Sequence, residues 1–463
     1  MKYSEEIKQK EFSVAVPDSI HKEIINAITD KGYIRFMIAG AYKPSDGLER
    51  FTCLIYRLFL PEQSQNIIDF LKSAYELLSQ EGAGLVVIGG KEGLDELLRS
   101  EEYASFLMAS QLPSLFLAID KEVSPEARIL IDRDIFKEAS TIRIIGKKLS
   151  VYYDEASRII PEFKEIYKRT VTVWGKKNHD HLARLRVGII GLGSVGSLVA
   201  EALARMGVER FVLVDFDEIQ LHNLDRLLGA SVDDIGLPKV TVAHRQILLA
   251  ATATNVEVTP VISGITEGAG YRRALDCDIL FSCVDRPWPR YILNNLAYNH
   301  LIPVVDGGIQ VRLNPETLEF EGADWQVQSV GPDRPCLECL EAYKPADVSI
   351  EQQGLLEDPT YLAGLPEDHE FKRNENIFPF SMNLASLEVL QFIEQVTGIG
   401  HTHYYGTQRF SYNEGYIRLN DERCCQPGCL FKAGVALGDT IFPPPVGLDF
   451  TAEQARLRQN KND

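Results

Sequence analysis

The sequence predicts an α/β protein built around a doubly wound, mostly parallel sheet, with an N-terminal α+β domain in front of it. Two observations predict this fold class. Between residues 184 and 312, short apolar runs typical of buried strands alternate with stretches of helical periodicity, as in sheets whose parallel strands are joined by helices. The first of these runs leads into a glycine-rich loop that opens a helix, which is the usual ligand-binding turn of such a sheet.

The central strands and helices are expected in a regular order. Strands are expected at Arg186–Ile190, Arg210–Asp215, Asn255–Val261, Ile279–Cys283 and Ile302–Asp306, and helices at Val195–Met206, Lys239–Ala250 and near Arg290–Asn299. Outside this region, strands are expected at Phe51–Leu60 and Gly84–Gly89, and helices at Ser64–Glu81 and Ser381–Val396. The 463 residues leave room for two to four domains.

Pattern changes along the chain predict the domain boundaries. An N-terminal domain is expected over 1–150, a charged connector over 151–183 and the central domain over 184–440. Within the last, the polar stretch 343–376 is too long for an ordinary loop and is expected to cross over the functional site. The end of the chain, 441–463, is expected to be a flexible tail.

Charge and hydropathy exclude two classes of partner. Lys and Arg total 48 and Asp and Glu total 66, a net charge of −18, so no large basic surface is available to bind a nucleic-acid backbone. No apolar run is long enough to span a membrane, and the charged opening residues lack the apolar core of a secretion signal. The sequence therefore predicts a cytoplasmic protein without nucleic-acid or membrane partners.

The glycine loop predicts a nucleotide site. It reads Gly191-Leu-Gly193-Ser-Val-Gly196, where the first two glycines permit a tight turn close to a ligand and the third lets the helix pack on the sheet. Asp215, at the end of the second strand, suits a ribose hydroxyl. The motif alone is equally typical of a nicotinamide or flavin dehydrogenase.

Charged residues after the loop favour a nucleoside triphosphate over a dinucleotide. Asp217, Asn223, Arg226 and Lys239 follow in order, and Asp285 ends a later strand. Arg and Lys can hold phosphates while a carboxylate holds Mg²⁺. Several of these residues also have structural alternatives: Asp217 could cap a turn, Asn223 could hydrogen-bond a loop backbone, and Arg290, which follows Asp285, could be an exposed helix charge.

Two cysteine pairs predict a structural zinc site. Cys336 and Cys339 form a C-x-x-C pair, and Cys425 and Cys429 form a second pair around a Pro-Gly turn. Four thiolates from two turns suit tetrahedral Zn²⁺. Cys424 could replace Cys425 as a ligand, and reduced core cysteines are the alternative to a metal site.

This ordered set of motifs resembles the ThiF/MoeB/ubiquitin-activating enzyme family over about 166–430. The resemblance implies a Rossmann-like adenylation domain that uses ATP and Mg²⁺ and carries structural Zn²⁺. It also implies that the glycine loop and Asp215 hold adenosine, that Asn223, Arg226 and Lys239 bind the triphosphate, and that Asp285 binds Mg²⁺ at the reacting centre. Family members often form homodimers in which one subunit lends an arginine, for which Arg169 stands at about the right distance before the loop, with Arg184 and Arg186 nearby as alternatives.

The activity implied by the resemblance is adenylation of the C-terminal carboxylate of a ubiquitin-like protein, with release of pyrophosphate and transfer to a conjugating-type partner. Activation of a sulfur carrier or a small carboxylate stays open, as do an NAD-dependent oxidoreductase and an inactive scaffold. No cysteine lies between Cys339 and Cys424, so Cys424 is the candidate for a thioester in that region. Residues 1–150 faintly resemble a JAB/MPN metalloprotease domain, and Val87-Ile-Gly-Gly90 stands where its His-x-His is expected, so we predict a metal-free pseudo-domain.

Overall fold

The computed structural model describes residues 8–440 except 31–35, 62–65, 110–113, 120–123, 133–134, 157–163, 315, 358–362, 364–374, 401–405 and 421–422. The chain forms two compact units. One contains mainly the residues up to 160, together with 298–301 and 434–442, and the other contains mainly 161–297 and 302–433. The predicted tail, 441–463, and the middle of the predicted crossover lie outside the described residues.

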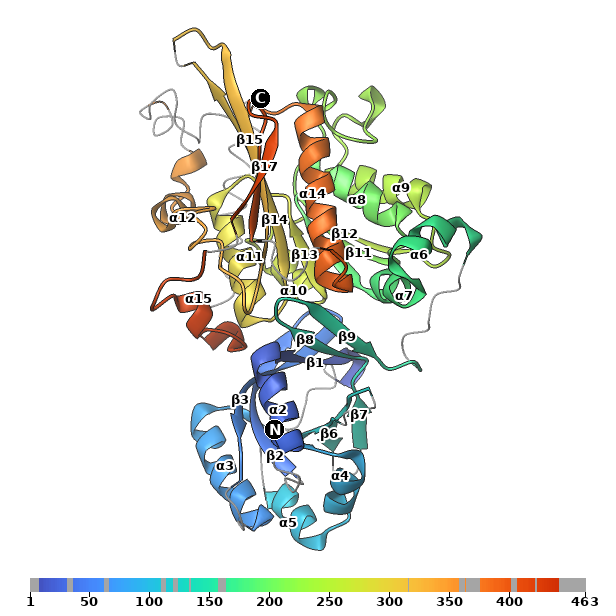
Figure 1. Cartoon of the computed structure of the whole chain (residues 1–463), viewed down its shortest axis with the longest axis vertical. Coiled ribbons are helices and arrows are strands. Elements are labelled where there is room, and N and C mark those ends of the chain that lie inside the picture. Colours follow the sequence, from blue (N-terminus) through green and yellow to red (C-terminus); the bar gives the residue numbers. More distant parts are fainter. Residues whose placement is uncertain are drawn as a thin grey trace. The chain divides into compact units, whose positions relative to one another are not determined.

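The N-terminal unit is a nine-stranded mixed sheet with helices, coloured blue to cyan and teal in Figure 1. Its elements are β1 (Glu11–Pro17), α2 (Asp18–Asp30), β2 (Phe36–Asp46), β3 (Arg50–Phe59), α3 (Ile67–Glu81), β4 (Gly84–Gly89), α4 (Lys91–Leu98), α5 (Glu101–Ala109), β5 (Ser114–Ala118), β6 (Glu126–Asp132), β7 (Ile135–Glu138), β8 (Thr141–Ile145) and β9 (Leu149–Tyr153). The sheet order is β7-β6-β5-β4-β2-β3-β1-β8-β9.

Local sequence explains the predicted elements of this unit. All six residues of β4 are buried, as expected of a continuous apolar run in the middle of a sheet. Helix α3 begins after Asn66, whose side chain accepts a hydrogen bond from the backbone N–H of Ile68 at 2.8 Å, and ends at Gly82 with φ +68°. The strands expected near β3 and β4 and the helix expected near α3 are therefore present, although α3 starts three residues later than its apolar pattern.

The second unit contains an eight-stranded sheet of order β12-β11-β10-β13-β14-β15-β16-β17. Its strands are β10 (Arg186–Ile190), β11 (Arg210–Val214), β12 (Glu257–Val261), β13 (Ile279–Ser282), β14 (Val304–Leu313), β15 (Phe320–Val330), β16 (Thr407–Ser411) and β17 (Tyr416–Asn420). Its α-helices are α6 (Lys168–Trp174), α7 (Lys176–Arg184), α8 (Ser194–Arg205), α9 (Lys239–Ala250), α10 (Gly268–Ala274), α11 (Pro287–Asn299), α12 (Pro345–Gln352), α14 (Phe378–Thr397) and α15 (Leu430–Ala433).

Strands β12, β11, β10, β13 and β14 pair in parallel, which confirms the doubly wound, mostly parallel sheet. The chain leaves β10 through α8 toward β11, and leaves β13 through α11 in the opposite direction along the sheet. Right-handed crossovers therefore put α8 and α11 on opposite faces. Helix α14, the long orange helix of Figure 1, packs against α8, β14 and β15.

Strand β14 is longer than the apolar run that predicted it, because its second half pairs with β15 in an antiparallel hairpin. Strands β16 and β17 continue this antiparallel extension to the edge of the sheet. Among the described residues, no helix has both the length and the apolar character needed to cross a membrane.

Candidate nucleotide site and cysteine cluster

Three loops meet at the point where the strand order of the second sheet reverses. Strand β10 lies between β11 and β13, and all three are parallel, so their carboxyl ends lie at one edge. The glycine loop follows β10, Asp215 follows β11, and Asp285 comes three residues after the end of β13. In open α/β sheets this crevice is where ligands bind.

The glycine loop needs glycine at two of its three positions. Gly191 has φ +88°, and a Cβ there would lie 2.5 Å from the carbonyl oxygen of Cys283. A Cβ at Gly196 would lie 2.0 Å from the carbonyl oxygen of Gly191, so the first turn of α8 packs directly on the loop. At Gly193, no described atom lies within 4 Å of an added Cβ, and this open side is where a ligand can approach the backbone.

Asp215 joins the loop to the second strand. Its Oδ2 accepts a hydrogen bond from the N–H of Leu192 at 2.6 Å, and its Oδ1 accepts one from the N–H of Asp217 at 2.8 Å. Burial raises the pKa of Asp215 to about 6, although the nearby Lys239 ammonium opposes the shift. The carboxylate is fixed in place and keeps lone pairs for a ribose hydroxyl.

Lys239 lies among the acids of the crevice. Its Nζ is 2.7 Å from Oδ2 of Asp217. Burial alone would lower the pKa of Lys239, but the charges of Asp215, Asp217 and Asp285 outweigh it and raise that pKa. The side chain therefore stays an ammonium, and a phosphate group could replace Asp217 as its partner. Asp285 is exposed at the mouth of the crevice, where its carboxylate is accessible to Mg²⁺.

Asn223 and Arg226 make local contacts on the described structure. The side chain of Asn223 accepts a hydrogen bond from the N–H of Gln220 at 3.0 Å, which is the backbone contact named above as its structural alternative. Arg226 donates to the carbonyl of His222 at 2.7 Å and to Asp225 at 2.8 Å. None of these hydrogen bonds is to Asp285 or Lys239. The roles of Asn223 and Arg226 in binding the triphosphate therefore stay predictions.

Three arginines near the nucleotide crevice or before the glycine loop in the sequence differ in exposure. Arg169 is exposed on α6, as a donor to a second subunit must be. Arg186 is buried on β10, where it donates to the carbonyl of Asp276 at 3.3 Å and supports the sheet. Arg290, on α11, is half-buried and donates to the carbonyls of Gly307 and Ala342 at 3.0 and 3.1 Å, so it is not an exposed helix charge.

The two ends of the predicted crossover lie on opposite sides of the crevice. At its start, Glu351 on α12 accepts a hydrogen bond from the N–H of Trp288 at 2.8 Å, in the first turn of α11. At its end, Asn376 donates to the hydroxyl of Ser194 at 3.0 Å, in the first turn of α8. Helix α11 begins just after Asp285, and α8 begins in the glycine loop. Residues 358–362 and 364–374, between these two contacts, lie outside the described residues, so the crossover stays a prediction.

Four cysteines form one compact cluster. The Sγ atoms of Cys336, Cys339, Cys425 and Cys429 all lie within 4.8 Å of one another. Those of Cys336 and Cys429 are 3.7 Å apart, close to the separation of about 3.8 Å that tetrahedral Zn–S bonds of about 2.3 Å require. Of the two adjacent candidates it is Cys425 that joins the cluster, and Cys424 is exposed.

Backbone groups also support metal binding at this cluster. The N–H groups of Cys336, Cys339 and Gln426 donate to sulfur atoms of the cluster at 3.2 to 3.4 Å. A hydrogen bond from the Cys336 thiol lowers the pKa of Cys425 to about 5. Such contacts to thiolates tune and orient metal ligands, so the residues present fit Zn²⁺. Within the described residues this is the one group of three or more His, Cys, Asp and Glu side chains close enough together to hold a metal ion between them.

The sequence relationships agree with this arrangement. A family model described as the ThiF family matches residues 167–427, more than half of the chain. The chain belongs to the ThiF family. Members of this family are adenylyltransferase-type activating enzymes that depend on ATP and Mg²⁺.

Curated relatives of this ThiF-family chain have several activities in their names. It is 30% identical over 176 residues to the SAMP-activating enzyme E1 of Haloferax volcanii, covering 38% of this chain and 60% of that protein. It is 30% identical to tRNA threonylcarbamoyladenosine dehydratase 2 of Saccharomyces cerevisiae, covering 34% and 35%, and 25% identical to ubiquitin-like modifier-activating enzyme 5 of Drosophila willistoni, covering 41% and 47%. The chain thus spans between about a third and 60% of these relatives' lengths.

Among solved structures, the chain resembles E. coli MccB bound to ATP, with a TM-score of 0.45 and 18% identity over 58% of this chain and 75% of that one.

One group of residues in this ThiF-family chain was not predicted. Glu388 on α14 is fully buried beside Asp306, Cys283 and Arg290. Burial raises its pKa well above the usual range, and the neighbouring Asp306 carboxylate adds to the shift. The Sγ of Cys283 lies 3.7 Å from Glu388, and burial likewise raises the pKa of this thiol, so Cys283 is a poor nucleophile. The available signal was a Glu between Leu387 and Val389 in a mostly apolar helix.

Proposed function

We propose that the chain catalyses ATP- and Mg²⁺-dependent adenylation of the C-terminal carboxylate of a small ubiquitin-like or sulfur-carrier-like protein. The observation that carries the proposal is the meeting of the open glycine loop, Asp215, Lys239 and Asp285 at one edge of the sheet. This set provides a place for adenosine, a cation for phosphates and a carboxylate for a metal ion. The crossover ends on either side supply a path for an extended tail.

The reaction needs little covalent chemistry from the protein. A carboxylate oxygen of the substrate attacks the α-phosphorus of ATP, the bond from that phosphorus to the bridging oxygen breaks, and pyrophosphate leaves. Lys239 would move from Asp217 to the phosphates and stabilise the charge that develops there. Mg²⁺, when bound at Asp285, would neutralise phosphate charge. Zn²⁺ in the cysteine cluster would serve structure alone.

The later steps of the pathway are part of the proposal. The acyl adenylate could pass directly to a conjugating-type partner, or first to the exposed Cys424 as a thioester. We also propose that the chain acts as a homodimer in which Arg169 reaches the site of the other subunit. The N-terminal unit is proposed to be a metal-free pseudo-domain that serves dimerisation or partner docking.

The relatives named as tRNA dehydratases support a second candidate, the activation of a carboxylate carried on a tRNA nucleoside. The stretch shared with the Bacillus subtilis tRNA threonylcarbamoyladenosine dehydratase is 40% identical over 81 residues. The net charge of −18 opposes it, because a tRNA-binding surface needs an excess of basic side chains.

ATP–pyrophosphate exchange tests the proposal. Small proteins that end in a free glycine carboxylate should support exchange with the wild type, whereas Asp285→Ala should reduce the rate by about a thousandfold. Asp233→Ala, which removes an exposed carboxylate elsewhere, should leave the rate unchanged. Exchange that depends on a modified tRNA and on no protein would replace the first candidate with the second. Full exchange by Asp285→Ala would remove the metal role of Asp285.

A further inference from the structure

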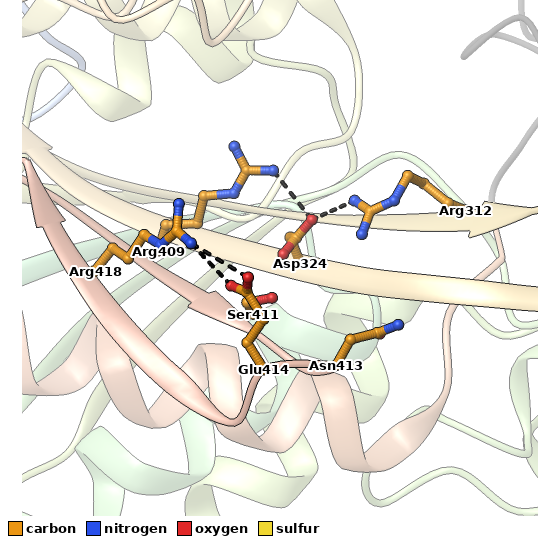
Figure 2. Close-up of a pocket in the computed structure, with 7 residues that line it drawn as sticks. All are labelled: Arg312, Asp324, Arg409, Ser411, Asn413, Glu414 and Arg418. Carbon is orange, nitrogen blue, oxygen red and sulfur yellow. Dashed lines mark hydrogen bonds and ion pairs between the residues drawn. The ribbon is translucent and has the colours of Figure 1, made fainter.

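An arginine-rich pocket lies on the antiparallel extension of the second sheet, outside the nucleotide crevice. Its volume is about 430 Å³. Figure 2 shows side chains from β14, β15, β16, β17 and the β16–β17 turn around it. Its charged lining consists of Arg312, Arg409, Arg418, Asp324 and Glu414. We call this set the arginine pocket.

The charges of the arginine pocket do not cancel. Arg312 and Arg409 both donate to Oδ2 of Asp324, the second at 3.0 Å, and Arg418 pairs with Glu414 at 3.1 Å (Figure 2). Three guanidinium groups therefore share two carboxylates, which leaves one positive charge in excess. The three arginine side chains keep 43%, 49% and 59% of their surface exposed, so their remaining N–H groups are accessible to a ligand.

Two of the arginines are placed at a cost to stability. Arg409 and Arg418 are register partners in the antiparallel β16–β17 pair. Like charges directly opposite one another on a sheet face are destabilising, and Asp324 and Glu414 compensate this repulsion only in part. An incoming carboxylate would lie between two guanidinium groups and relieve it. The arrangement is thus suited to binding an anion.

The pocket is connected to the nucleotide crevice by a single row of residues. Arg418, Arg409, Gln326 and Gly308 are successive register partners across β17, β16, β15 and β14, and so they share one face of the sheet. A Cβ at Gly308 would lie 2.9 Å from Nη2 of Arg290, on the helix that begins two residues after Asp285. Three strand spacings of about 4.8 Å give about 14 Å, which about four extended residues can span.

We propose that the arginine pocket binds a carboxylate side chain on the surface of the protein substrate, while the substrate's extended C-terminal tail follows this row to the crevice. The inference rests on the proposed function and adds to it the chemistry of the partner, an acidic patch beside the tail. A single excess positive charge matches one carboxylate better than a polyphosphate, because a polyphosphate concentrates several negative charges in one group that would lie close to Asp324 and Glu414. The pocket is a basic feature on a chain of net charge −18, which favours a specific contact over general attraction.

The first test uses fluorescein-labelled hexaglutamate as the probe and measures its fluorescence anisotropy with the full chain. Wild type should bind hexaglutamate and not hexaserine. Arg409→Glu and Arg418→Glu should each weaken binding by about tenfold or more, and Arg418→Lys by much less. Arg272→Glu, an exposed arginine on α10, is the matched control and should bind as wild type does.

Three results would overturn the proposal: no binding of hexaglutamate by wild type, unchanged binding by the folded Arg418→Glu variant, or displacement of the probe by tripolyphosphate at far lower concentration than by unlabelled hexaglutamate. The last result would assign the pocket to a phosphate ligand. Thermal melting of each variant establishes that it is folded.

A second measurement separates this inference from the proposed function. With a protein that supports ATP–pyrophosphate exchange, Arg418→Glu should raise the KM for that protein by about tenfold and leave the KM for ATP unchanged. An unchanged KM for the protein would refute the pocket's role while the adenylation activity stood. If no protein supports exchange, the proposed function fails, and hexaglutamate binding still decides whether the pocket takes carboxylates.

Discussion

At the scale of single residues, Asp215 makes the pH dependence of nucleoside binding predictable. Its pKa of about 6 means that it becomes protonated when the pH falls below neutrality. If only the carboxylate accepts the ribose hydroxyl, affinity for adenosine should fall by roughly tenfold between about pH 7.5 and pH 5. Calorimetry with adenosine measures this without interference from phosphate titration. Asp215→Asn should bind weakly at every pH, and a wild-type affinity that does not vary over this range would contradict the assignment.

Glu388 leads to a second prediction at the same scale. Its pKa is raised well above the usual range, mainly by burial, so the folded state holds a proton that the unfolded state releases. The stability contributed by the neutral carboxyl is present below the unfolded pKa of about 4.3 and decreases by about 1.4 kcal/mol per pH unit until the native pKa is reached. Urea unfolding over about pH 5 to 8.5 should show this decrease for wild type but a shallower one for Glu388→Gln. The variant should equal or exceed wild type at the alkaline end; equal slopes would exclude this role.

A site residue could be predicted from the sequence where its contacts are to residues nearby in the chain. The glycine loop and Lys239 belong to motifs read over a few residues, and the strand–loop–helix pattern places them. The choice between Cys424 and Cys425 needed the position of Cys336, about 89 residues away. Glu388 stands out as a Glu in a mostly apolar helix, but its partners Asp306 and Cys283 lie on other strands and loops, so the sequence around Glu388 does not indicate which residues it meets.

At the scale of elements, the cysteine cluster holds together two segments separated in the chain. Cys425→Ser should lose bound zinc and lower the stability of the second unit by about 3 kcal/mol, or roughly 10 °C in Tm for a domain of this size. Cys424→Ser is the matched control, because its thiol lies outside the cluster, and should keep both zinc and Tm. Zinc analysis by atomic emission and thermal melting measure the two effects. Zinc loss in the Cys424 variant instead would reverse the assignment of the ligand.

Among the strands, too, those recognisable from local sequence could be predicted, and pairings that depend on distant residues could not. Four of the five parallel strands were predictable because each contains a buried apolar run next to a helix in the chain, whereas β12, whose residues are exposed or half-buried, was predictable from its place in the alternation of strands and helices. The row from Gly308 to Arg418 was not predictable, because it depends on the registers of three antiparallel pairs, one of which joins β15 to β16 across a long stretch of intervening chain. A one-residue slip in any of them would move Arg409 or Arg418 to the opposite face. The registers of these strand pairs, which no short stretch of sequence determines, therefore bring the residues of the arginine pocket together.

At the scale of the whole molecule, the proposed dimer makes a quantitative prediction. Arg169→Ala and Asp285→Ala should each abolish ATP–pyrophosphate exchange alone. If Arg169 acts on the partner's site, mixed dimers of the two variants contain one site with both native residues. Random mixing makes half of the dimers mixed, so exchange should return to about a quarter of the wild-type rate. The matched control pairs Lys168→Ala, an exposed neighbour on the same helix, with Asp285→Ala, and there the Lys168 variant should be active by itself. No recovery after co-refolding or co-expression of the Arg169 and Asp285 variants would place the arginine in its own subunit's site or outside the site altogether.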